Sequence, residues 1–303
     1  MRVAQQKYKT KKEGMLKMSM SSFPVSLLIT QQIKPLIEGK TIAEIKCETY
    51  YKGRYSWHGD SFHNLEDVKN SKIIYADSNF ILTDSNHIIE FGYFTGDLRY
   101  FNDVAEINIK PSKKSETDGY ILTFYFTDNS CMTLILYSWS TWFSINENNI
   151  GQPEVIPKSP IEITDDIVFT LDNFKKWLAE RGNMNIVENC STVKGAFDIY
   201  NPVMSYILLI SKIYPRTKTR SLSDDDIERL YNNIKNIVDD YKTGKRICEF
   251  DDIFGNKVNA ENDVVWLNAG TLGKPCPVCC TPIDFTPCAG TKMYFCPSCQ
   301  VKK

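Results

Sequence analysis

The sequence has no apolar run of roughly 18 residues, the length that a membrane-spanning helix needs. We expect no secretory leader either, because the first apolar stretch, Phe23 to Ile29, is short and follows a long polar segment. Histidine is scarce, with three among 303 residues, and none of the three has the spacing of metal ligands or of a catalytic pair. These absences argue against a membrane protein and against a histidine-based active site.

A basic excess is also missing, since 36 lysines and arginines face 37 acidic residues and the net charge is −1. The charge is uneven along the chain. Residues 1–20 hold six basic residues and one acidic residue, a charge of +5, which leaves −6 for the remainder. A nucleic-acid-binding domain usually carries a basic excess. Such a function therefore has to rest on a local basic patch here.

Cysteine is plentiful, with ten residues, but a chain of this length does not need disulfide staples. Four of the ten form a metal-type pattern, so we expect a reducing compartment such as the cytoplasm. The pattern is Cys276-Pro-Val-Cys279, then sixteen residues, then Cys296-Pro-Ser-Cys299.

This spacing predicts one structural zinc ion. Two thiolates two residues apart face the same tetrahedral metal when each pair sits in a tight turn, and the long gap forms a hairpin that joins the pairs. Four thiolates leave no open coordination position, so this zinc does no chemistry. Two disulfides are the alternative, which fits poorly with a reducing compartment. Cys280 and Cys288 are the competing ligands, and Cys280 would distort the turn because it follows Cys279 directly.

The first half of the chain predicts one helix followed by strands. Apolar residues in Val25–Ile37 fall on one helical face, and Gly39 is the stop signal. Between Thr41 and Tyr137, β-branched and aromatic stretches alternate with turn signals. Short strands at this spacing predict an antiparallel sandwich or barrel.

The second half predicts helices. Thr170 can cap a helix that ends near Gly182, and a second helix is expected over residues 202–211. Ser223 is the expected cap of a third helix, with Asp226 in the capping-box position.

Two segments near the end of the chain carry a family resemblance. Residues 273–283 (GKPCPVCCTPI) and 294–300 (YFCPSCQ) look like the zinc finger of the formamidopyrimidine-DNA glycosylase and endonuclease VIII family. Three more segments, in that family's order, resemble its first element, its void-filling loop and its helix-two-turn-helix entry: residues 39–42, 91–96 and 201–215. The resemblance covers residues 21–300.

The resemblance implies an α+β fold. An N-terminal antiparallel β-sandwich lobe faces a C-terminal helical helix-two-turn-helix lobe, which ends in a β-hairpin zinc finger. The implied parts are a disordered basic tail, a helix with the sandwich lobe, a linker, the helix-two-turn-helix DNA-binding domain and the zinc finger: residues 1–20, 21–150, 151–162, 163–260 and 261–303. The implied cofactor is one structural Zn²⁺. The implied partner is double-stranded DNA, damaged or abasic, bound by a monomer.

The family's chemistry depends on two residues that this sequence has replaced. Family members extrude a damaged base and cleave its glycosidic bond with the α-amine of an N-terminal proline, while a neighbouring glutamate transfers protons. These positions fall on Ser21 and Ser22. The Ser21 nitrogen is an amide in this sequence, so its lone pair is held in resonance. The Ser22 hydroxyl has no useful pKa for general acid–base work near neutrality.

Other family positions have changed too. The sandwich-lobe lysine falls on Asn79, and the arginine of the zinc hairpin falls on Thr291, with Lys292 beside it. The glycine-rich turn before Asn201 is replaced, and Asp198 in it would face phosphate unfavourably.

Each candidate DNA contact has a structural alternative. Asn201 is a phosphate donor or the N-cap before Pro202. Phe94 is the wedge that fills the gap in the duplex or a core aromatic. Lys292 is a phosphate contact or a solvated surface lysine. The best local basic patch comprises Lys194, Lys212, Arg216, Lys218 and Arg220.

The sequence therefore supports three hypotheses. The first is a DNA-binding protein that recognises damaged or abasic DNA with a degenerate active site. The second is an active DNA glycosylase and abasic-site lyase, in which translation from Met20 or processing exposes the Ser21 α-amine as the catalytic group. The third is a protein-interaction module without DNA binding, which the acidic remainder of the chain favours.

Overall fold

The computed structural model describes residues 23–49, 65–92, 96–107, 120–136, 142–147, 163–190, 199–261, 263 and 267–302. The expected basic tail and linker, residues 1–20 and 151–162, lie outside these ranges. Within them, no helix combines the length and the apolar character that crossing a membrane requires.

The first element is the helix α1 (Val25–Ile37), which has the predicted bounds. Its buried side chains lie on the face that the apolar period predicted, and they include Leu28, Ile29, Ile33 and Ile37. Gly39 follows with φ +85°, a backbone conformation that favours glycine, so the predicted stop signal is confirmed.

Eight strands form two four-stranded antiparallel sheets. The first sheet has the order β1 (Ile42–Thr49), β6 (Tyr120–Phe126), β7 (Cys131–Leu136) and β5 (Gly96–Phe101). The second has the order β2 (Ile73–Ala76), β3 (Phe80–Thr83), β4 (His87–Gly92) and β8 (Trp142–Glu147). The predicted end of the strand region at Tyr137 is wrong, because β8 lies beyond it. Pairing with β4 over six residues holds β8 in the sheet.

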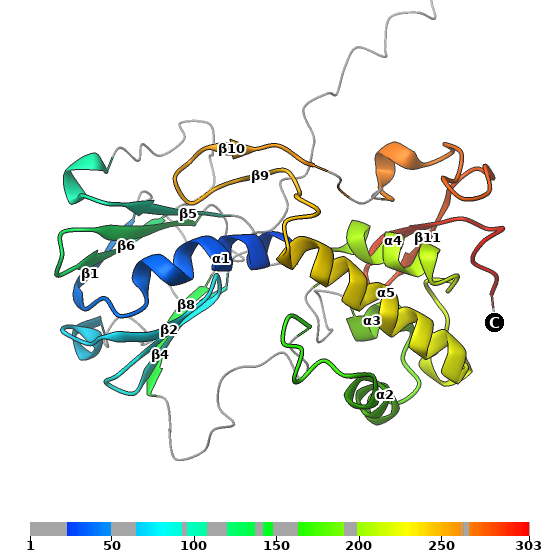
Figure 1. Ribbon diagram of the computed structural model, residues 1–303, viewed down its shortest axis with the longest axis horizontal. Helices are drawn as coiled ribbons and strands as arrows, with labels where there is room; N and C mark the ends of the chain where they lie inside the picture. The colour runs from blue at the N-terminus through cyan, green and yellow to red at the C-terminus, as the bar shows by residue number, and fades with distance from the viewer. Residues whose placement is uncertain are drawn as a thin grey trace, which may run out of the picture.

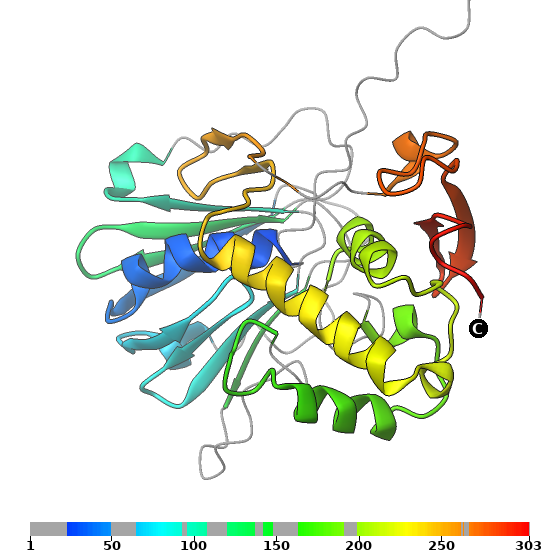
Figure 2. The same cartoon turned by 45° about the vertical axis from the view of Figure 1, so that its right-hand side comes forward.

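The two sheets lie on opposite sides of α1, and all three share one core (Figures 1 and 2). Buried side chains from the first sheet, such as Phe124, meet Ile29 and Ile33 of α1 and Ile81 of the second sheet in this core. A helix inserted at the edge of two sheets buries an apolar face that would otherwise be exposed.

Helices dominate the second half. They are α2 (Leu171–Glu180), α3 (Ile186–Cys190), α4 (Asn201–Ile210) and α5 (Asp224–Lys242). Short 3₁₀ turns occur at Val104–Glu106, Thr219–Ser221 and Ala269–Thr271.

The predicted helix starts are confirmed where a cap defines them. Thr170 accepts a hydrogen bond from the Asn173 amide, and Ser223 forms a capping box with Asp226. The expectation of a fold that mixes helices and sheets is confirmed as well.

After α5 the chain returns to the first sheet before it reaches the cysteines. The short strands β9 (Phe250–Asp251) and β10 (Lys257–Val258) form a hairpin whose turn lies against β5. There the Tyr100 amide donates to the Ile253 carbonyl (2.8 Å), and the Ile253 amide donates to Oε1 of Gln32 in α1 (3.2 Å). This return ties the helical half to the sheets.

The last elements are β11 (Asp284–Cys288) and β12 (Thr291–Phe295), an antiparallel hairpin that packs against α4 (Figure 1). Ala289 and Gly290 make its tight turn, both with positive φ, which suits a two-residue hairpin connection. The C-terminal segment therefore docks on the helical half.

Candidate functional site

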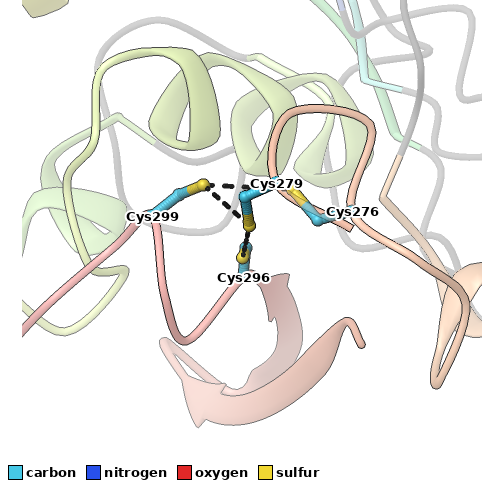
Figure 3. Close-up of side chains that lie close together, drawn as sticks. All are labelled: Cys276, Cys279, Cys296 and Cys299. Atoms are coloured by element: carbon cyan, nitrogen blue, oxygen red, sulfur yellow. Dashed lines mark hydrogen bonds between the residues drawn. The ribbon is translucent and has the colours of Figure 1, made fainter. Parts of the chain in front are cut away.

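The four predicted metal ligands converge on one point (Figure 3). The Sγ atoms of Cys276, Cys279, Cys296 and Cys299 all lie within 4.8 Å of one another. Cys279 Sγ is 3.4 Å from the Sγ atoms of both Cys296 and Cys299, and Cys276 Sγ is 4.0 Å from that of Cys299. The predicted convergence is confirmed, and a cluster of this kind can hold a metal ion.

Backbone hydrogen bonds shape each pair into a tight turn. The Cys280 amide donates to the Cys276 carbonyl (3.0 Å), and the Val278 amide points at Cys276 Sγ (3.4 Å). In the second turn the Gln300 amide donates to the Cys296 carbonyl (3.0 Å). These two turns present their sulfur atoms to a common centre, as tetrahedral thiolate sites require.

The two competing cysteines are not part of the cluster. Cys280 is exposed and has φ +63°, so it closes the first turn in a left-handed conformation. Cys288 is buried in the hairpin, where its thiol lies 3.3 Å from Asn185 Oδ1 and 3.6 Å from the Pro215 carbonyl.

The thiols of the cluster have divergent proton affinities. Hydrogen bonds from the Thr281 hydroxyl and amide, and then from neighbouring thiols, lower the pKa of Cys279 to about 6. Burial, followed by the adjacent thiols, raises the pKa of Cys299, and burial also raises that of Cys296. Ionisation of all four thiols is therefore opposed, first by burial and then by the repulsion between neighbouring charges. A cation at the centre offsets that repulsion.

Four exposed cations surround the turn that follows α4. Residues 213–215, Thr217 and Thr219 are buried between the exposed cations, so the segment is packed while its charged side chains reach solvent. The exposed set is Lys212, Arg216, Lys218 and Arg220. In the part of the chain that the structure describes, no ion pair neutralises any of the four.

The turn itself is a helix C-cap. Lys212, with φ +57°, donates its amide to the Leu209 carbonyl, and the Ile213 amide donates to the Leu208 carbonyl, both at 3.0 Å. This pair of bonds is a Schellman motif, with a lysine where glycine is usual. Further along, the Ile186 amide donates to the Thr217 carbonyl and the Thr219 amide donates to the Met184 carbonyl, both at 2.9 Å, so the backbone is held on both sides of Lys218.

Lys292 lies on β12 and is exposed, with its Nζ 4.9 Å from the ring centroid of Phe285. It belongs to the hairpin that packs on α4. The C-terminal unit, residues 267–302, therefore carries both this cation and the four cysteines. The structure does not describe Lys194 or Phe94, and their predicted roles stay untested.

The start of α1 is joined to the start of α4. The Tyr200 amide donates to the Phe23 carbonyl (3.2 Å), and Phe23 pairs with Ile199 in a short parallel bridge. The buried Phe23 ring packs edge-on against Tyr241 of α5, with the ring centroids 5.4 Å apart. Ser21 and Ser22 lie outside the described residues, but they directly precede this anchor.

Asn201 is the first residue of α4, and Tyr200 occupies the N-cap position without a side-chain hydrogen bond. The reading of Asn201 as the N-cap is therefore wrong. The Tyr200 carbonyl accepts the first helical hydrogen bond, from the Met204 amide (3.0 Å), so the helix starts one residue earlier than the N-cap reading requires. The Asn201 Oδ1 atom is buried, and no donor in the described part of the chain reaches it.

Asn79, at the position of the family lysine, lies in the turn between β2 and β3. Its amide donates to Asp77 Oδ1 (2.6 Å), and its own Oδ1 atom is buried without a donor among the described residues. The neighbouring Ser78 amide donates to Thr30 Oγ1 of α1 (3.0 Å). The turn is therefore held against α1 and offers a neutral side chain there.

Sequence reasoning missed the residues that support the cluster. Gln300 stands in the quoted segment after the last cysteine but received no role, and Thr281 received none either. Nothing local to the sequence marks them, because their partners are backbone and thiol groups brought close by the fold.

The chain has sequence similarity to formamidopyrimidine-DNA glycosylases of several bacteria. No family model matches the chain. The chain is 28% identical over 145 residues to a formamidopyrimidine-DNA glycosylase of Herpetosiphon aurantiacus, covering 46% of this chain and 50% of that protein. It is 30% identical over 185 residues to the glycosylase of Listeria innocua, covering 59% and 65%. The aligned part thus spans between half and two thirds of these two relatives. With the glycosylase of Ligilactobacillus salivarius it is 22% identical over 300 residues, covering 94% and 100%.

Solved structures agree. A complex of the Lactococcus lactis enzyme with DNA containing N7-benzyl-Fapy-dG has a TM-score of 0.71 at 15% identity, covering 93% of this chain and all of that chain. A complex of the same enzyme with abasic DNA has a TM-score of 0.68 at 15% identity and the same coverage.

The chain therefore has the fold of a DNA glycosylase, and its C-terminal hairpin carries a four-cysteine cluster. The resemblance seen in the sequence is confirmed: in sequence and in fold, the chain is a relative of the formamidopyrimidine-DNA glycosylase family.

Proposed function

We propose that the chain is a DNA-binding protein of the formamidopyrimidine-DNA glycosylase superfamily that recognises damaged or abasic double-stranded DNA with a degenerate active site. One observation carries the DNA-binding part. Four exposed cations, from Lys212 to Arg220, have no ion-pair partner among the described residues and surround a turn that backbone hydrogen bonds close, next to the β11–β12 hairpin of the cysteine cluster (the metal hairpin). The matching Lactococcus lactis chains are complexes with damaged or abasic DNA.

In this proposal the two sheets and α1 are the sandwich lobe, α4 with its turn and α5 are the helix-two-turn-helix, and β11–β12 is the zinc finger. Zinc fits the cluster because four converging sulfur atoms suit its tetrahedral preference. Bound there, zinc would hold the two cysteine turns together and do no chemistry. Cys276, Cys279, Cys296 and Cys299 would be its ligands.

The degenerate active site follows from three replacements. Ser21 and Ser22 stand at the nucleophile and glutamate positions, and Asn79 stands at the lysine position. The Phe23 anchor supports the alignment, because it ties this segment to the entry of α4. A serine pair in a longer polypeptide supplies neither a free amine nor a carboxylate.

Fluorescence anisotropy with labelled duplexes tests the proposal. One duplex contains a tetrahydrofuran abasic-site analogue and the other is undamaged, and both are titrated at two salt concentrations. We expect tighter binding to the abasic duplex and weaker binding to both at the higher salt, because cation contacts to phosphate release counterions. Absence of any salt-sensitive complex would contradict DNA binding and favour the interaction module, which the −6 charge of residues 21–303 supports.

The enzyme is a second candidate, and the anchored Phe23 favours it. A chain that starts at Ser21 would present a primary amine two residues before a segment fixed beside α4. Primary amines form Schiff bases with abasic sites, and borohydride reduction makes the adduct permanent.

A further inference from the structure

The Gln300 side chain lies between the cysteine cluster and the basic turn, which is the segment of residues 212–220 that carries the four exposed cations. It is almost fully buried, at 1% exposure. Its Oε1 atom accepts a hydrogen bond from the amide of Cys296 (2.8 Å), and its Nε2 atom donates to the carbonyl of Ile213 (2.8 Å). One amide group thus joins the backbone of a metal ligand to the backbone of the turn.

We infer that Gln300 is a positioning residue that couples metal binding by the four cysteines to the geometry of the basic turn. The inference deepens the proposed function, because that turn carries Arg216 and Lys218. A buried amide with both ends bonded fixes the groups that it joins, since neither partner can turn to water.

The metal end of this link depends on the closed cysteine turn. The Gln300 amide donates to the Cys296 carbonyl (3.0 Å), so the same residue closes the turn that presents Cys296 and Cys299. A metal ion bonded to all four sulfur atoms would join the two cysteine turns, and without it the second turn loses that cross-link. The Gln300 side chain then no longer has a fixed position from which to reach Ile213.

The other end of the link sets the start of the basic turn. Ile213 is the residue after the left-handed Lys212, and its amide closes the Schellman motif on the Leu208 carbonyl. Gln300 holds the Ile213 carbonyl, so it fixes the peptide that leads toward Arg216.

Other contacts between the C-terminal residues and this turn come from the hairpin strands and from Lys302, whose Nζ lies 5.4 Å from the ring centroid of Tyr214. Tyr214 Oη lies 3.2 Å from Thr286 Oγ1, and its ring packs edge-on against Phe295 at 5.0 Å. The Cys288 thiol reaches the Pro215 carbonyl. These contacts hold the hairpin against the turn. Gln300 differs because it joins the backbone of a predicted metal ligand, Cys296, to the backbone of the turn at Ile213. Gln300 is therefore the contact through which the state of the metal site is expected to reach the turn.

Two variants separate the ends of the link. Gln300→Met keeps the length of the side chain and removes both hydrogen bonds. Gln300→Glu keeps an acceptor for the Cys296 amide and removes the donor to Ile213. Val301→Ala, at an exposed neighbouring position, is the matched control. Zinc content, amide hydrogen exchange of residues 212–220 and duplex affinity are measured for each full-length protein, with and without a chelator.

We expect chelation to speed amide exchange over residues 212–220 in the wild type and in Val301→Ala. In zinc-loaded Gln300→Met and Gln300→Glu that exchange should already be fast, and chelation should change it little. Zinc-loaded variants should bind the abasic duplex about tenfold more weakly than the wild type, within the usual range of coupling between two sites.

Three results would overturn the inference. Zinc-loaded variants could keep both slow exchange and wild-type affinity, which would limit Gln300 to packing. Both variants could fail to hold zinc, which would make Gln300 a support of the metal site alone. Chelation could leave exchange over 212–220 unchanged in the wild type, which would remove the coupling itself. If the wild type binds no DNA, the proposed function fails, while the exchange measurement still decides the inference.

Discussion

The metal hairpin and the start of α1 differ in how many of the residues required by the proposed function they contain. The hairpin has all four cysteines in one cluster, with closed turns and a buried supporting glutamine. The start of α1 has its anchor at Phe23, but in the proposed alignment Ser21 and Ser22 stand at the positions of the nucleophile and the proton carrier. The difference is one of stability. Loss of a metal ligand unfolds a segment, whereas loss of a catalytic side chain at a chain entry leaves the packing intact.

Breaking the better-preserved region should have the largest effect. Cys296→Ser removes one thiolate and leaves the others without a closed site, and structural zinc in small fingers is worth about 10 kcal/mol or more of folding free energy. We expect loss of the bound zinc and a non-native C-terminal segment, followed by metal analysis and limited proteolysis. Cys280→Ser, at an exposed cysteine outside the cluster, is the control. Equal zinc content in both variants would refute the assigned ligand set.

The second test concerns the basic residues that precede α1 in the sequence. Deleting residues 1–20 takes away +5 and leaves a chain of charge −6. If the six basic residues contact phosphate, the slope of log affinity against log salt should become shallower by up to about 5, since each contact contributes about 0.9. Anisotropy titrations of both chains over a salt series measure the slope. An unchanged slope would confine DNA binding to the remainder of the chain.

Each cation of the basic turn is expected to contribute a smaller part of the DNA affinity. Lys218→Ala should weaken binding to abasic and undamaged duplexes equally and reduce the salt slope by about 1, because a phosphate contact reads no sequence. Lys69→Ala is the matched control, since Lys69 is exposed and pairs with Glu66 at 3.4 Å far from the turn in sequence. Equal effects of the two substitutions would show that net charge, not the turn, determines binding.

The smallest expected effect lies in the sheet region around α1, at the ion pair between Lys40 and Asp128. Burial opposes ionisation of Asp128, but hydrogen bonds from Lys40 and Ser130 outweigh it and lower the pKa of Asp128 from 3.8 to about 2. A lowered folded-state pKa stabilises the protein above the ordinary value, and this stabilisation is lost as the pH falls from 3.8 toward 2. Half of the Asp128 side chain is exposed, so the contribution is below about 1 kcal/mol.

Urea unfolding of the wild type and of Lys40→Met at about pH 5 and about pH 2.5 measures this contribution. The two proteins should differ more at the higher pH. A difference that grows toward low pH would contradict the assigned pair.

Local signals in the sequence predicted the elements that local contacts define. The bounds of α1 followed from its apolar period, and the starts of α2 and α5 followed from Thr170 and Ser223. The cysteine cluster followed from spacing, because tetrahedral coordination allows few alternatives.

Long-range contacts decided what the sequence did not predict. The strand β8 depends on pairing with β4, and the return of residues 250–258 to β5 depends on Tyr100 and Gln32. Asn201 is a helical residue, and the N-cap residue before it, Tyr200, binds Phe23, which is far away in the sequence. The role of Gln300 depends on Ile213, a partner 87 residues away. Periodicity and motifs within one segment do not predict pairs of residues that are far apart in the sequence.

Borohydride trapping on abasic-site DNA tests the central claim most directly. Three proteins are compared: the chain that begins at Met1, a chain that begins at Ser21, and the latter with Ser21→Pro and Ser22→Glu. The account predicts no covalent adduct with the first, at most a faint one with the second, and a stronger one with the third, which regains the secondary amine and the carboxylate. A strong adduct with the first chain, at a rate typical of enzymes, would contradict the account.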